Sequence, residues 1–373
     1  MFLRDHCYLK RLEEPHVYDI QSDELYLLDE EGFHRILALQ AGGNDPEAGE
    51  LLREAGLAQE SPRSGPPFFE GSAADPSLRY LEVQITGRCD KACRHCYLGP
   101  PDKRDMDRGT FHRILEEFTA AQGLKVMVSG GEPACHPLFR EMSGDLGRWP
   151  MRRVLITHGE WIGPREARDL RDVYHQVQVS LDGWQEGHDR LRGPGSFARA
   201  VEGIRALRSA GVPVSAATMV HRHNLDEFQR MDAFLREMGV QEWSIDVPCP
   251  AGRWAGEDLE PEQLRAMSEK LRHAYGGGFH GGARGLSCGS HLMTVGPDGT
   301  AAKCGFYFHE PAGNVREGLA RVWERVPHVP LSSLRCRCPQ LAECAGGCRF
   351  RAQVLEGSPL APDIVQCYAR GVE

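Results

Sequence analysis

The chain contains no segment suited to crossing a membrane and no export signal. No apolar run approaches the roughly 20 residues of a membrane-spanning helix, and the N-terminus lacks the pattern of a secretory signal. Dense basic blocks are also missing, since 44 Lys and Arg are outnumbered by 53 Asp and Glu, for a formal net charge of −9. We therefore expect a cytoplasmic protein that binds neither membrane nor nucleic acid.

Disulfide bonds are not expected either, although the chain has 13 cysteines. Thiols stay reduced in a protein that is not exported, so this many cysteines indicates metal ligation. Three of them lie within 89–96 and seven within 288–367, which leaves Cys7, Cys135 and Cys249 scattered. With 373 residues, the chain is long enough for two or three domains.

Cys89, Cys93 and Cys96 have the spacing C-x3-C-x2-C, directly after an alternating apolar run at 80–86 that predicts a strand. Three thiolates on one loop occupy three corners of a metal centre and leave the fourth open. Structural zinc takes four protein ligands, whereas a 4Fe–4S cluster with one free iron offers a coordination site to a substrate. The loop closely resembles that of the radical S-adenosylmethionine (radical SAM) enzymes.

Short strands and helices alternate after residue 78. Apolar residues in a helical stripe, such as Phe111, Ile114, Leu115 and Phe118, predict the helices. This alternation predicts an α/β fold with a parallel sheet and right-handed crossovers. Six such units resemble the partial, TIM-like (β/α)6 barrel of radical SAM enzymes, where functional groups gather at the C-terminal ends of the strands. Strands are expected at 80–86, 124–129, 152–157, 176–181, 213–220 and 241–247.

The resemblance implies a 4Fe–4S cluster on Cys89, Cys93 and Cys96, with S-adenosylmethionine (SAM) on its free iron. The stretch 129–133, Ser-Gly-Gly-Glu-Pro, matches the family's GGEP motif, whose glycines allow a close backbone approach and whose carboxylate can accept hydrogen bonds from an ammonium. The segment 180–193 (SLDG-x4-HDRLRG) is highly similar to the branch that modifies peptides and proteins. The SAM-binding residues implied in this way are His95, Gly130, Gly131, Glu132, Ser180, Asp182 and Arg192.

No catalytic acid or base can be assigned from the sequence. Two weak candidates stand at strand ends: His158, where relatives often carry Asn, and Asp246 after the sixth strand. An ordinary histidine at a strand end and a structural or capping aspartate explain these two residues equally well.

The C-terminal cysteines resemble the SPASM extension, which holds auxiliary 4Fe–4S clusters. The resemblance assigns Cys288, Cys304 and Cys348 to one cluster. The first cluster lacks its usual fourth cysteine, so its iron is either open to substrate or ligated by His291, as imidazole does in Rieske centres. The stretch Cys336-Arg-Cys338 replaces the family's C-x2-C, and Gly305 stands where sulfatase-maturing relatives carry a basic aspartate. A zinc ribbon is the competing interpretation. The second cluster is assigned Cys336, Cys338, Cys344 and Cys367.

Five segments are expected along the chain. Residues 1–60 predict a small α+β unit, with an antiparallel ribbon and helices near 30–40 and 46–57. This layout is similar to winged-helix domains that capture a leader peptide by β-augmentation, and a structural cap is the alternative. The further segments are a linker at 61–77, the radical SAM core at 78–255, a connecting segment at 256–285 and the SPASM domain at 286–373.

The resemblance implies an enzyme that reductively cleaves SAM to a 5′-deoxyadenosyl radical. The radical then abstracts hydrogen from a residue of a ribosomally made peptide, which leads to an oxidative modification or a cross-link. Flavodoxin or ferredoxin is the expected electron donor, and one or two auxiliary 4Fe–4S clusters are expected beside the first. Two alternatives stay open: a small molecule or a folded protein as the substrate, and a non-catalytic iron–sulfur electron carrier.

Overall fold

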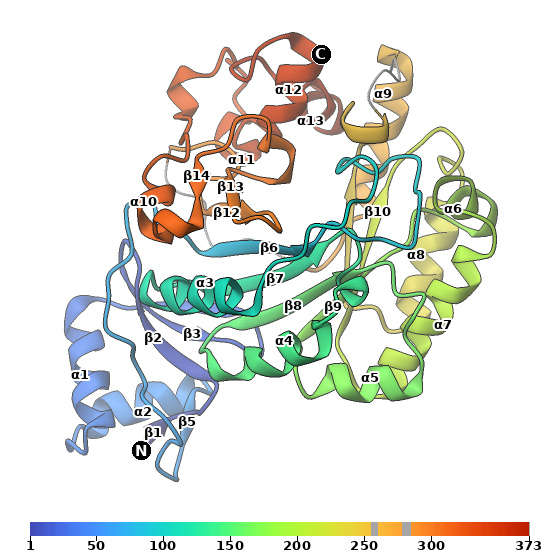
Figure 1. Ribbon diagram of the computed structural model, residues 1–373. Helices are drawn as coiled ribbons and strands as arrows, with labels where there is room; N and C mark the ends of the chain where they lie inside the picture. Colours follow the sequence, from blue (N-terminus) through green and yellow to red (C-terminus); the bar gives the residue numbers. More distant parts are fainter. Residues whose placement is uncertain (255–259, 278–284, 373) are drawn as a thin grey trace.

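A nine-stranded mixed sheet forms the centre of the molecule, with the strand order β11-β10-β9-β8-β7-β6-β12-β13-β14 (Figure 1). The computed structural model describes residues 1–254, 260–277 and 285–372. Strands β6 to β11 are parallel and adjacent in chain order. The predicted α/β class and all six predicted strands are confirmed. These strands are β6 (Tyr80–Thr86), β7 (Lys125–Gly130), β8 (Arg152–Thr157), β9 (Gln176–Ser180), β10 (Val214–Met219) and β11 (Glu242–Asp246).

Helices between these strands cover the outer face of the parallel sheet (Figure 1). In α3 the predicted stripe is buried, and Phe111, Leu115 and Phe118 are at most 1 % exposed within the main core. The helix begins after Asp107, whose carboxylate accepts a hydrogen bond from the amide of Thr110 at 2.8 Å. The helices are α3 (Arg108–Ala120), α4 (Phe139–Asp145), α5 (Pro164–Arg171), α6 (Gln185–Arg192), α7 (Ser196–Ser209) and α8 (Phe228–Glu237).

Strand β6 separates the apolar core from a polar interior. Leu81, Val83 and Ile85 belong to the main core, while the alternate residues Glu82 and Gln84 line a cavity on the other side. Successive side chains of a strand point to opposite faces, so one strand contributes to both the packing and the site.

Residues 1–60 form a unit with its own apolar core, which includes Leu9, Val17 and Phe33. The predicted antiparallel ribbon and two helices are confirmed; the winged-helix likeness stays a prediction. Strand β2 is covered on its outer edge by the linker, through the amide of Leu9 and the carbonyl of Pro67 at 2.8 Å. The elements are β1 (Phe2–Leu3), β2 (Cys7–Arg11), β3 (Pro15–Asp19), β4 (Glu24–Leu27), α1 (Glu30–Gln40), α2 (Pro46–Glu54) and β5 (Ala58–Gln59).

The C-terminal segment continues the central sheet. Strand β12 (Leu292–Val295) pairs in parallel with β6, and β13 (Thr300–Ala302) and β14 (Gly313–Asn314) follow antiparallel. Parts of the predicted connecting segment, residues 256–259 and 278–284, lie outside the described residues. The remaining helices are α9 (Pro261–Ser268), α10 (Leu319–Trp323), α11 (Leu341–Cys344), α12 (Arg349–Glu356) and α13 (Ile364–Ala369). Among the helices of the described chain, none has both the length and the apolar character needed to span a bilayer.

Lys10 joins the N-terminal unit to the core and makes the stability of the folded chain depend on pH. Lys10 is 3 % exposed, and its ammonium donates to the carbonyl of Gly123 at 2.8 Å. Burial lowers the pKa of Lys10 from 10.5 to about 7. Between these values the unfolded chain holds a proton that the folded chain lacks, so this lysine makes stability rise with pH.

We therefore expect the free energy of unfolding of the wild type to rise by about 2 kcal/mol more than that of Lys10→Met between pH 7 and pH 9. Urea unfolding at the two pH values measures this difference. Lys103→Met, at an exposed position, should keep the wild-type pH dependence. Equal pH dependence in wild type and Lys10→Met would contradict the role of Lys10.

Candidate active site

A cavity of about 1500 Å³ lies at the C-terminal ends of the parallel strands and extends to the C-terminal segment. It brings together predicted residues from several strand ends, among them Gly130, Ser180, Arg192 and Asp246. Glu132 and three of the ten predicted cysteine ligands, Cys336, Cys338 and Cys367, are not among the residues that line it. The seven cysteine ligands that do are Cys89, Cys93, Cys96, Cys288, Cys304, Cys344 and Cys348.

The spacing of the thiols fits an iron–sulfur cluster better than a single zinc ion. No three cysteines of the described chain have their sulfur atoms within 4.8 Å of one another. Four sulfurs on one tetrahedral zinc, with Zn–S bonds of ~2.3 Å, would lie about 4 Å apart. Burial raises the pKa of Cys89 to about 12, so a positively charged metal centre is needed to keep this sulfur a thiolate.

Two glycines of the GGEP turn allow it to pack against the cysteine loop. A Cβ atom on Gly130 would lie 2.3 Å from the carbonyl oxygen of Thr86, and one on Gly131 would lie 2.2 Å from that of Arg88. The amide of Gly131 donates to the carbonyl of Thr86 at 2.9 Å. No side chain fits at either position, so the glycines fix the distance between the turn and the loop.

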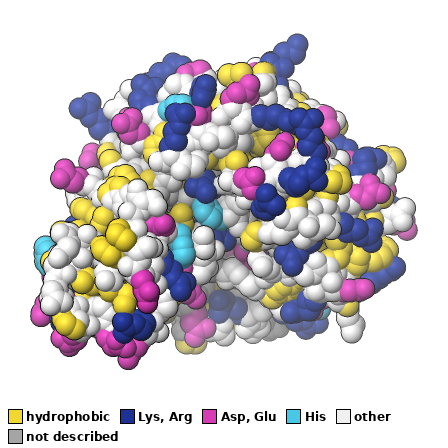
Figure 2. All heavy atoms as spheres, turned by 90° about the horizontal axis from the view of Figure 1, so that it is seen from below, with side chains coloured by type: hydrophobic (Ala, Val, Ile, Leu, Met, Phe, Trp, Pro, Cys, Tyr) yellow, Lys and Arg dark blue, Asp and Glu magenta, His cyan; other side chains and the backbone are white. Residues whose placement is uncertain are grey.

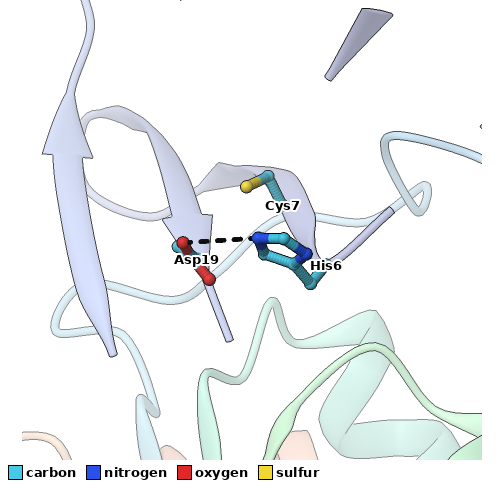
Figure 3. A group of neighbouring side chains, drawn as sticks. All are labelled: His6, Cys7 and Asp19. Carbon is cyan, nitrogen blue, oxygen red and sulfur yellow. Dashed lines mark ion pairs between the residues drawn. The ribbon is translucent and has the colours of Figure 1, made fainter. Parts of the chain in front are cut away.

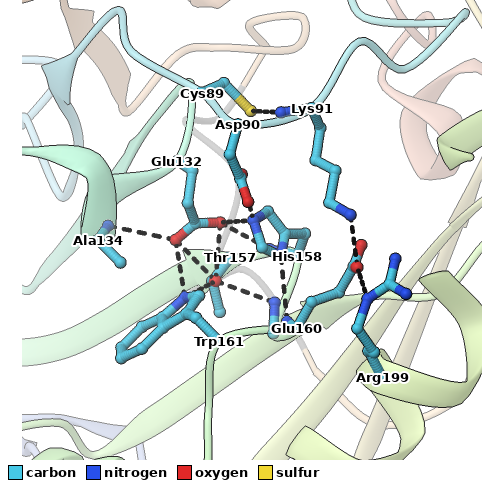
Figure 4. Close-up of polar contacts among 11 residues, drawn as sticks. Cys89, Asp90, Lys91, Glu132, Ala134, Thr157, His158, Glu160, Trp161 and Arg199 are labelled. Carbon is cyan, nitrogen blue, oxygen red and sulfur yellow. Dashed lines mark hydrogen bonds and ion pairs between the residues drawn. The ribbon is translucent and has the colours of Figure 1, made fainter.

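Glu132 is buried, and its carboxylate is occupied by protein donors (Figure 4). It accepts hydrogen bonds from the hydroxyl of Thr157 at 2.9 Å, the amide of His158 at 3.0 Å and the indole N–H of Trp161 at 3.0 Å. Gly130 and Gly131, rather than this carboxylate, line the cavity at the GGEP turn. Glu132 thus joins the loops that follow β7 and β8.

His158 connects that network to the cysteine loop (Figure 4). Its Nε2 lies 3.0 Å from Asp90, which stands next to Cys89, and its Nδ1 accepts from the amide of Glu160 at 3.0 Å. Burial lowers the pKa of His158, but the hydrogen bond to Asp90 and the charge of Glu132 outweigh burial and raise it. Both ring nitrogens are engaged by the protein, which indicates that His158 positions the loop.

Asp182 holds two other predicted SAM-binding residues, Arg192 and His95. It is fully buried, forms an ion pair with Arg192 and lies 3.3 Å from Nε2 of His95. Burial would raise the pKa of Asp182, but the charge of Arg192 keeps it well below its usual range. Burial lowers the pKa of His95 to about 4, so its ring is neutral near pH 7. Its Nδ1 is buried without a protein partner and is free for a ligand.

Two further predicted residues lie on the cavity wall. Ser180 ends β9, and Asp246 ends β11. The carboxylate of Asp246 accepts a hydrogen bond from Arg351 at 2.7 Å. This aspartate therefore has a structural partner on α12, as the alternative interpretation of the sequence expects.

Sequence reasoning missed the polar floor of the cavity. Glu82 accepts hydrogen bonds from the hydroxyls of Ser129 at 2.6 Å and Thr294 at 3.0 Å, and Gln84 donates to the hydroxyl of Tyr97 at 3.2 Å. A signal was present, because polar residues at 82, 84 and 86 alternate with apolar residues at 81, 83 and 85. A strand that is polar on its barrel-facing side predicts a polar interior.

The C-terminal cysteines form two groups. Cys288 and Cys348 line the cavity with Cys304, and their sulfurs accept hydrogen bonds at 3.4 Å from the amides of Arg349 and Arg351 respectively. In the second group, the neighbouring Cys336, Cys338 and Cys344 contribute to a raised pKa of Cys367, for which burial is the largest cause. Both predicted ligand sets are thus brought together in space.

His291 and Gly305 clarify two departures from the family pattern. The Nδ1 of His291 lies 2.7 Å from the carbonyl oxygen of Ser77, just before β6. A Cβ atom on Gly305 would lie 2.9 Å from the ring of Tyr97, and the adjacent Phe306 packs on that ring with centroids 4.8 Å apart. Aromatic packing therefore occupies the place beside Cys304 where sulfatase-maturing relatives carry their base.

A separate group of metal-ligand residue types, His6, Cys7 and Asp19, lies in the N-terminal unit (Figure 3). Cys7 and Asp19 are paired across β2 and β3, and none of the three residues lines the cavity. Asp19 accepts a hydrogen bond from the amide of Gln21 at 2.8 Å, and its other oxygen is 3.6 Å from His6. These contacts stabilise the turn after β3.

Comparison with known proteins agrees with this geometry. Residues 83–235 match the radical SAM superfamily. Mycofactocin maturase MftC of Mycolicibacterium smegmatis is 30 % identical over 341 residues, which cover 82 % of this chain and 86 % of that protein. The chain belongs to the radical SAM superfamily. It is accordingly an enzyme that uses SAM and a 4Fe–4S cluster.

Two further similarities extend this assignment. The PqqA peptide cyclase of Ruegeria pomeroyi is 28 % identical over 331 residues, which cover 78 % of this radical SAM chain and 87 % of that protein. The crystal structure of Streptococcus suis SuiB bound to precursor peptide SuiA has a TM-score of 0.72 at 14 % identity and covers 97 % of this chain and 98 % of that chain. The fold likeness therefore includes the N-terminal unit.

The buried pair of Asp182 and Arg192 predicts the effect of removing one charge. In Asp182→Asn, the guanidinium loses its partner and His95 loses a neighbour, so SAM should bind about 10- to 100-fold more weakly. Equilibrium binding of SAM to the reconstituted enzyme measures this loss. Glu186→Gln removes an exposed ion-pair partner on the same helix as Arg192 and should leave SAM affinity unchanged. Equal affinity in the two variants would exclude this role of Asp182.

Proposed function

We propose that this radical SAM enzyme oxidatively modifies or cross-links a residue of a ribosomally made peptide. One observation carries the proposal: the three cysteines of the loop and the three cysteines Cys288, Cys304 and Cys348 line the same cavity. A radical formed near the first set can therefore lose an electron near the second set within one cavity.

Different residues of the chain bind different groups of SAM. Backbone carbonyls at Gly130 and Gly131 accept hydrogen bonds from the ammonium of SAM. Arg192, held by Asp182, offers its guanidinium to polar groups of SAM, and Ser180 and the neutral ring of His95 complete the pocket. When bound to Cys89, Cys93 and Cys96, the 4Fe–4S cluster supplies the electron that cleaves SAM to methionine and a 5′-deoxyadenosyl radical. The barrel wall excludes water from the radical.

The redox balance of the proposed reaction requires an electron acceptor. Hydrogen abstraction converts a substrate C–H group to a carbon radical, and forming a new bond with loss of a proton releases one further electron. The C-terminal cysteines would hold one or two auxiliary 4Fe–4S clusters, which would supply an acceptor for this electron. A flavodoxin or ferredoxin supplies the electron for SAM cleavage.

A peptide substrate is supported by the relatives. The printed names of two of them describe a maturase and a peptide cyclase, and the structure of SuiB contains a precursor peptide. SuiB also shares the fold over 97 % of this chain, so its likeness is not confined to the radical SAM core.

The N-terminal unit recognises the leader of this peptide at strand β4. In the described chain β4 has one strand neighbour, β3, while the outer edge of β2 is covered by the linker. Leu27 on β4 is 62 % exposed, and apolar side chains are visible on this unit at the left of Figure 2. An open edge beside apolar side chains suits an added peptide strand.

A structural cap is the second candidate role for this unit. Lys10 and Arg152 make buried hydrogen bonds between the unit and the core, to the carbonyls of Gly123 at 2.8 Å and Ile20 at 2.9 Å. These contacts hold the unit in place whether or not a peptide binds, so a binding experiment must separate the two roles.

Mass spectrometry of a candidate precursor peptide, co-expressed with the enzyme, tests the reaction. A cross-link should lower the mass of the peptide by two hydrogen atoms. Cys93→Ala, which removes a ligand of the first cluster, should abolish both this change and the release of 5′-deoxyadenosine in vitro. Continued release of 5′-deoxyadenosine by Cys93→Ala would refute the assigned SAM site, whereas SAM cleavage without change in any candidate peptide would argue against a peptide substrate.

Leu27→Glu tests leader recognition at β4. A charge at this edge should weaken binding of the leader peptide by at least about tenfold, without changing 5′-deoxyadenosine formation in the absence of peptide. Anisotropy of a labelled leader peptide measures the affinity. Leu51→Glu on α2, where the native side chain is 58 % exposed, is the matched control. Equal peptide affinity in both variants would favour the cap.

A further inference from the structure

A fourth thiol lies among the C-terminal cysteines, although it comes from the barrel. Cys249 follows β11, is 5 % exposed and lines the cavity with Cys288, Cys304 and Cys348. Its thiol lies within hydrogen-bonding distance of the thiol of Cys348, so one of the two side chains must turn before both sulfurs can bind separate irons of one cluster. Sequence spacing gives no hint of this contact, because the two residues are about 100 positions apart.

The stretch that carries Cys249 is fixed against the cysteine loop. The amide of Arg253 donates to the carbonyl of Cys96 at 3.0 Å. Gly252 has a φ of +56°, and a Cβ atom there would lie 2.3 Å from the same carbonyl oxygen. The stretch therefore contacts the first cysteine set at Gly252 and the C-terminal set at Cys249.

Arg351 fixes Cys249 and Cys348 relative to each other. Its guanidinium is 2 % exposed and donates to Asp246 at 2.7 Å and to the carbonyl of Val247 at 3.3 Å, two residues before Cys249. It also donates to Asp363 at 2.8 Å, and Asp363 accepts from the amide of Cys348 at 2.8 Å. One buried guanidinium thus holds both backbone segments, which a chance contact between two thiols would not require.

We propose that Cys249 is the fourth protein ligand of the auxiliary iron–sulfur cluster held by Cys288, Cys304 and Cys348. This inference rests on the auxiliary clusters of the proposed function. Four thiolates are the usual ligand set of a 4Fe–4S cluster. The competing ligand is His291, which also lines the cavity. Its Nδ1 lies 2.7 Å from the carbonyl oxygen of Ser77, and its Nε2 is buried without a protein partner, as in a metal-binding histidine. The experiment must therefore distinguish Cys249 from His291.

A cluster with four protein ligands has no open iron for the substrate. It accepts an electron from the substrate radical without binding the substrate directly. Because one ligand comes from the barrel and three come from the C-terminal segment, this cluster also ties the two parts of the cavity together. Loss of Cys249 should then affect the auxiliary cluster and leave the first cluster in place.

The test is anaerobic reconstitution of Cys249→Ser, with iron and acid-labile sulfide counted and EPR spectra of the reduced protein recorded. The variant should lose about four irons per chain, as Cys304→Ser should, or show an altered EPR signal if the serine oxygen replaces the thiolate. Cys135→Ser and His291→Gln should match the wild type. Full iron content with a wild-type spectrum in Cys249→Ser, or an altered spectrum in His291→Gln alone, would overturn the assignment.

Two controls separate the role of Cys249 from the presence of the auxiliary clusters. Cys249→Ser should keep the EPR signal of the first cluster and its change on addition of SAM, which shows that the barrel is folded and the first cluster is present. If the serine variant does not fold, Cys249→Val preserves the apolar packing of this buried position and should lose the same iron. A wild-type protein that binds only about four irons would refute the auxiliary clusters themselves, and Cys249 as their ligand with them.

Discussion

Close backbone packing around the cysteine loop is the constraint on which the site depends. The loop at 89–96 has no regular secondary structure, yet it must hold three sulfurs in fixed positions. Gly130 and Gly131, at the end of β7, approach the carbonyls of Thr86 and Arg88 just before the loop, and Gly252, after β11, approaches the carbonyl of Cys96 within it. At each contact a Cβ atom would lie within 2.3 Å of a carbonyl oxygen, so strands far apart in the barrel fix one irregular loop.

Buried charges then define the polar side of the site. Glu132 and Asp182 are each at most 1 % exposed and are surrounded by donors. Burying such groups costs free energy that their partners only partly return. Hydrophobic residues of similar size would pack as well, so stability alone does not explain these carboxylates. Their contribution is positional: Glu132 joins two strand-end loops, and Asp182 orients Arg192 and His95 toward the same cavity.

Local sequence patterns predicted most of the fold, but they did not predict the contacts between distant segments. The six strands follow from alternation and length, and the residues at their ends follow from the parallel topology. The GGEP motif also predicts Glu132 at SAM; the structure shows its carboxylate accepting hydrogen bonds from Thr157 and Trp161, and a contact with SAM stays a prediction. The sequence near Cys288 offers His291 as a fourth ligand, whereas the proposed ligand Cys249 lies far earlier in the chain, where spacing gives no signal. Spacing identifies ligands within one loop, while the fold decides which remote residue joins them.

Continuity between the barrel and the C-terminal segment has a chemical consequence. Strand β12 extends the sheet beside β6, and Glu82 on β6 accepts a hydrogen bond from Thr294 on β12 at 3.0 Å. The Arg351 network makes a second connection at the opposite edge of the parallel strands, beside β11. Because both edges of the parallel strands are tied to the same segment, the two cysteine sets cannot separate without breaking sheet pairing and the ion pair between Arg351 and Asp246. The C-terminal cysteines, which are the proposed site of the electron acceptor, are therefore held beside the cavity in which the proposed substrate radical would form.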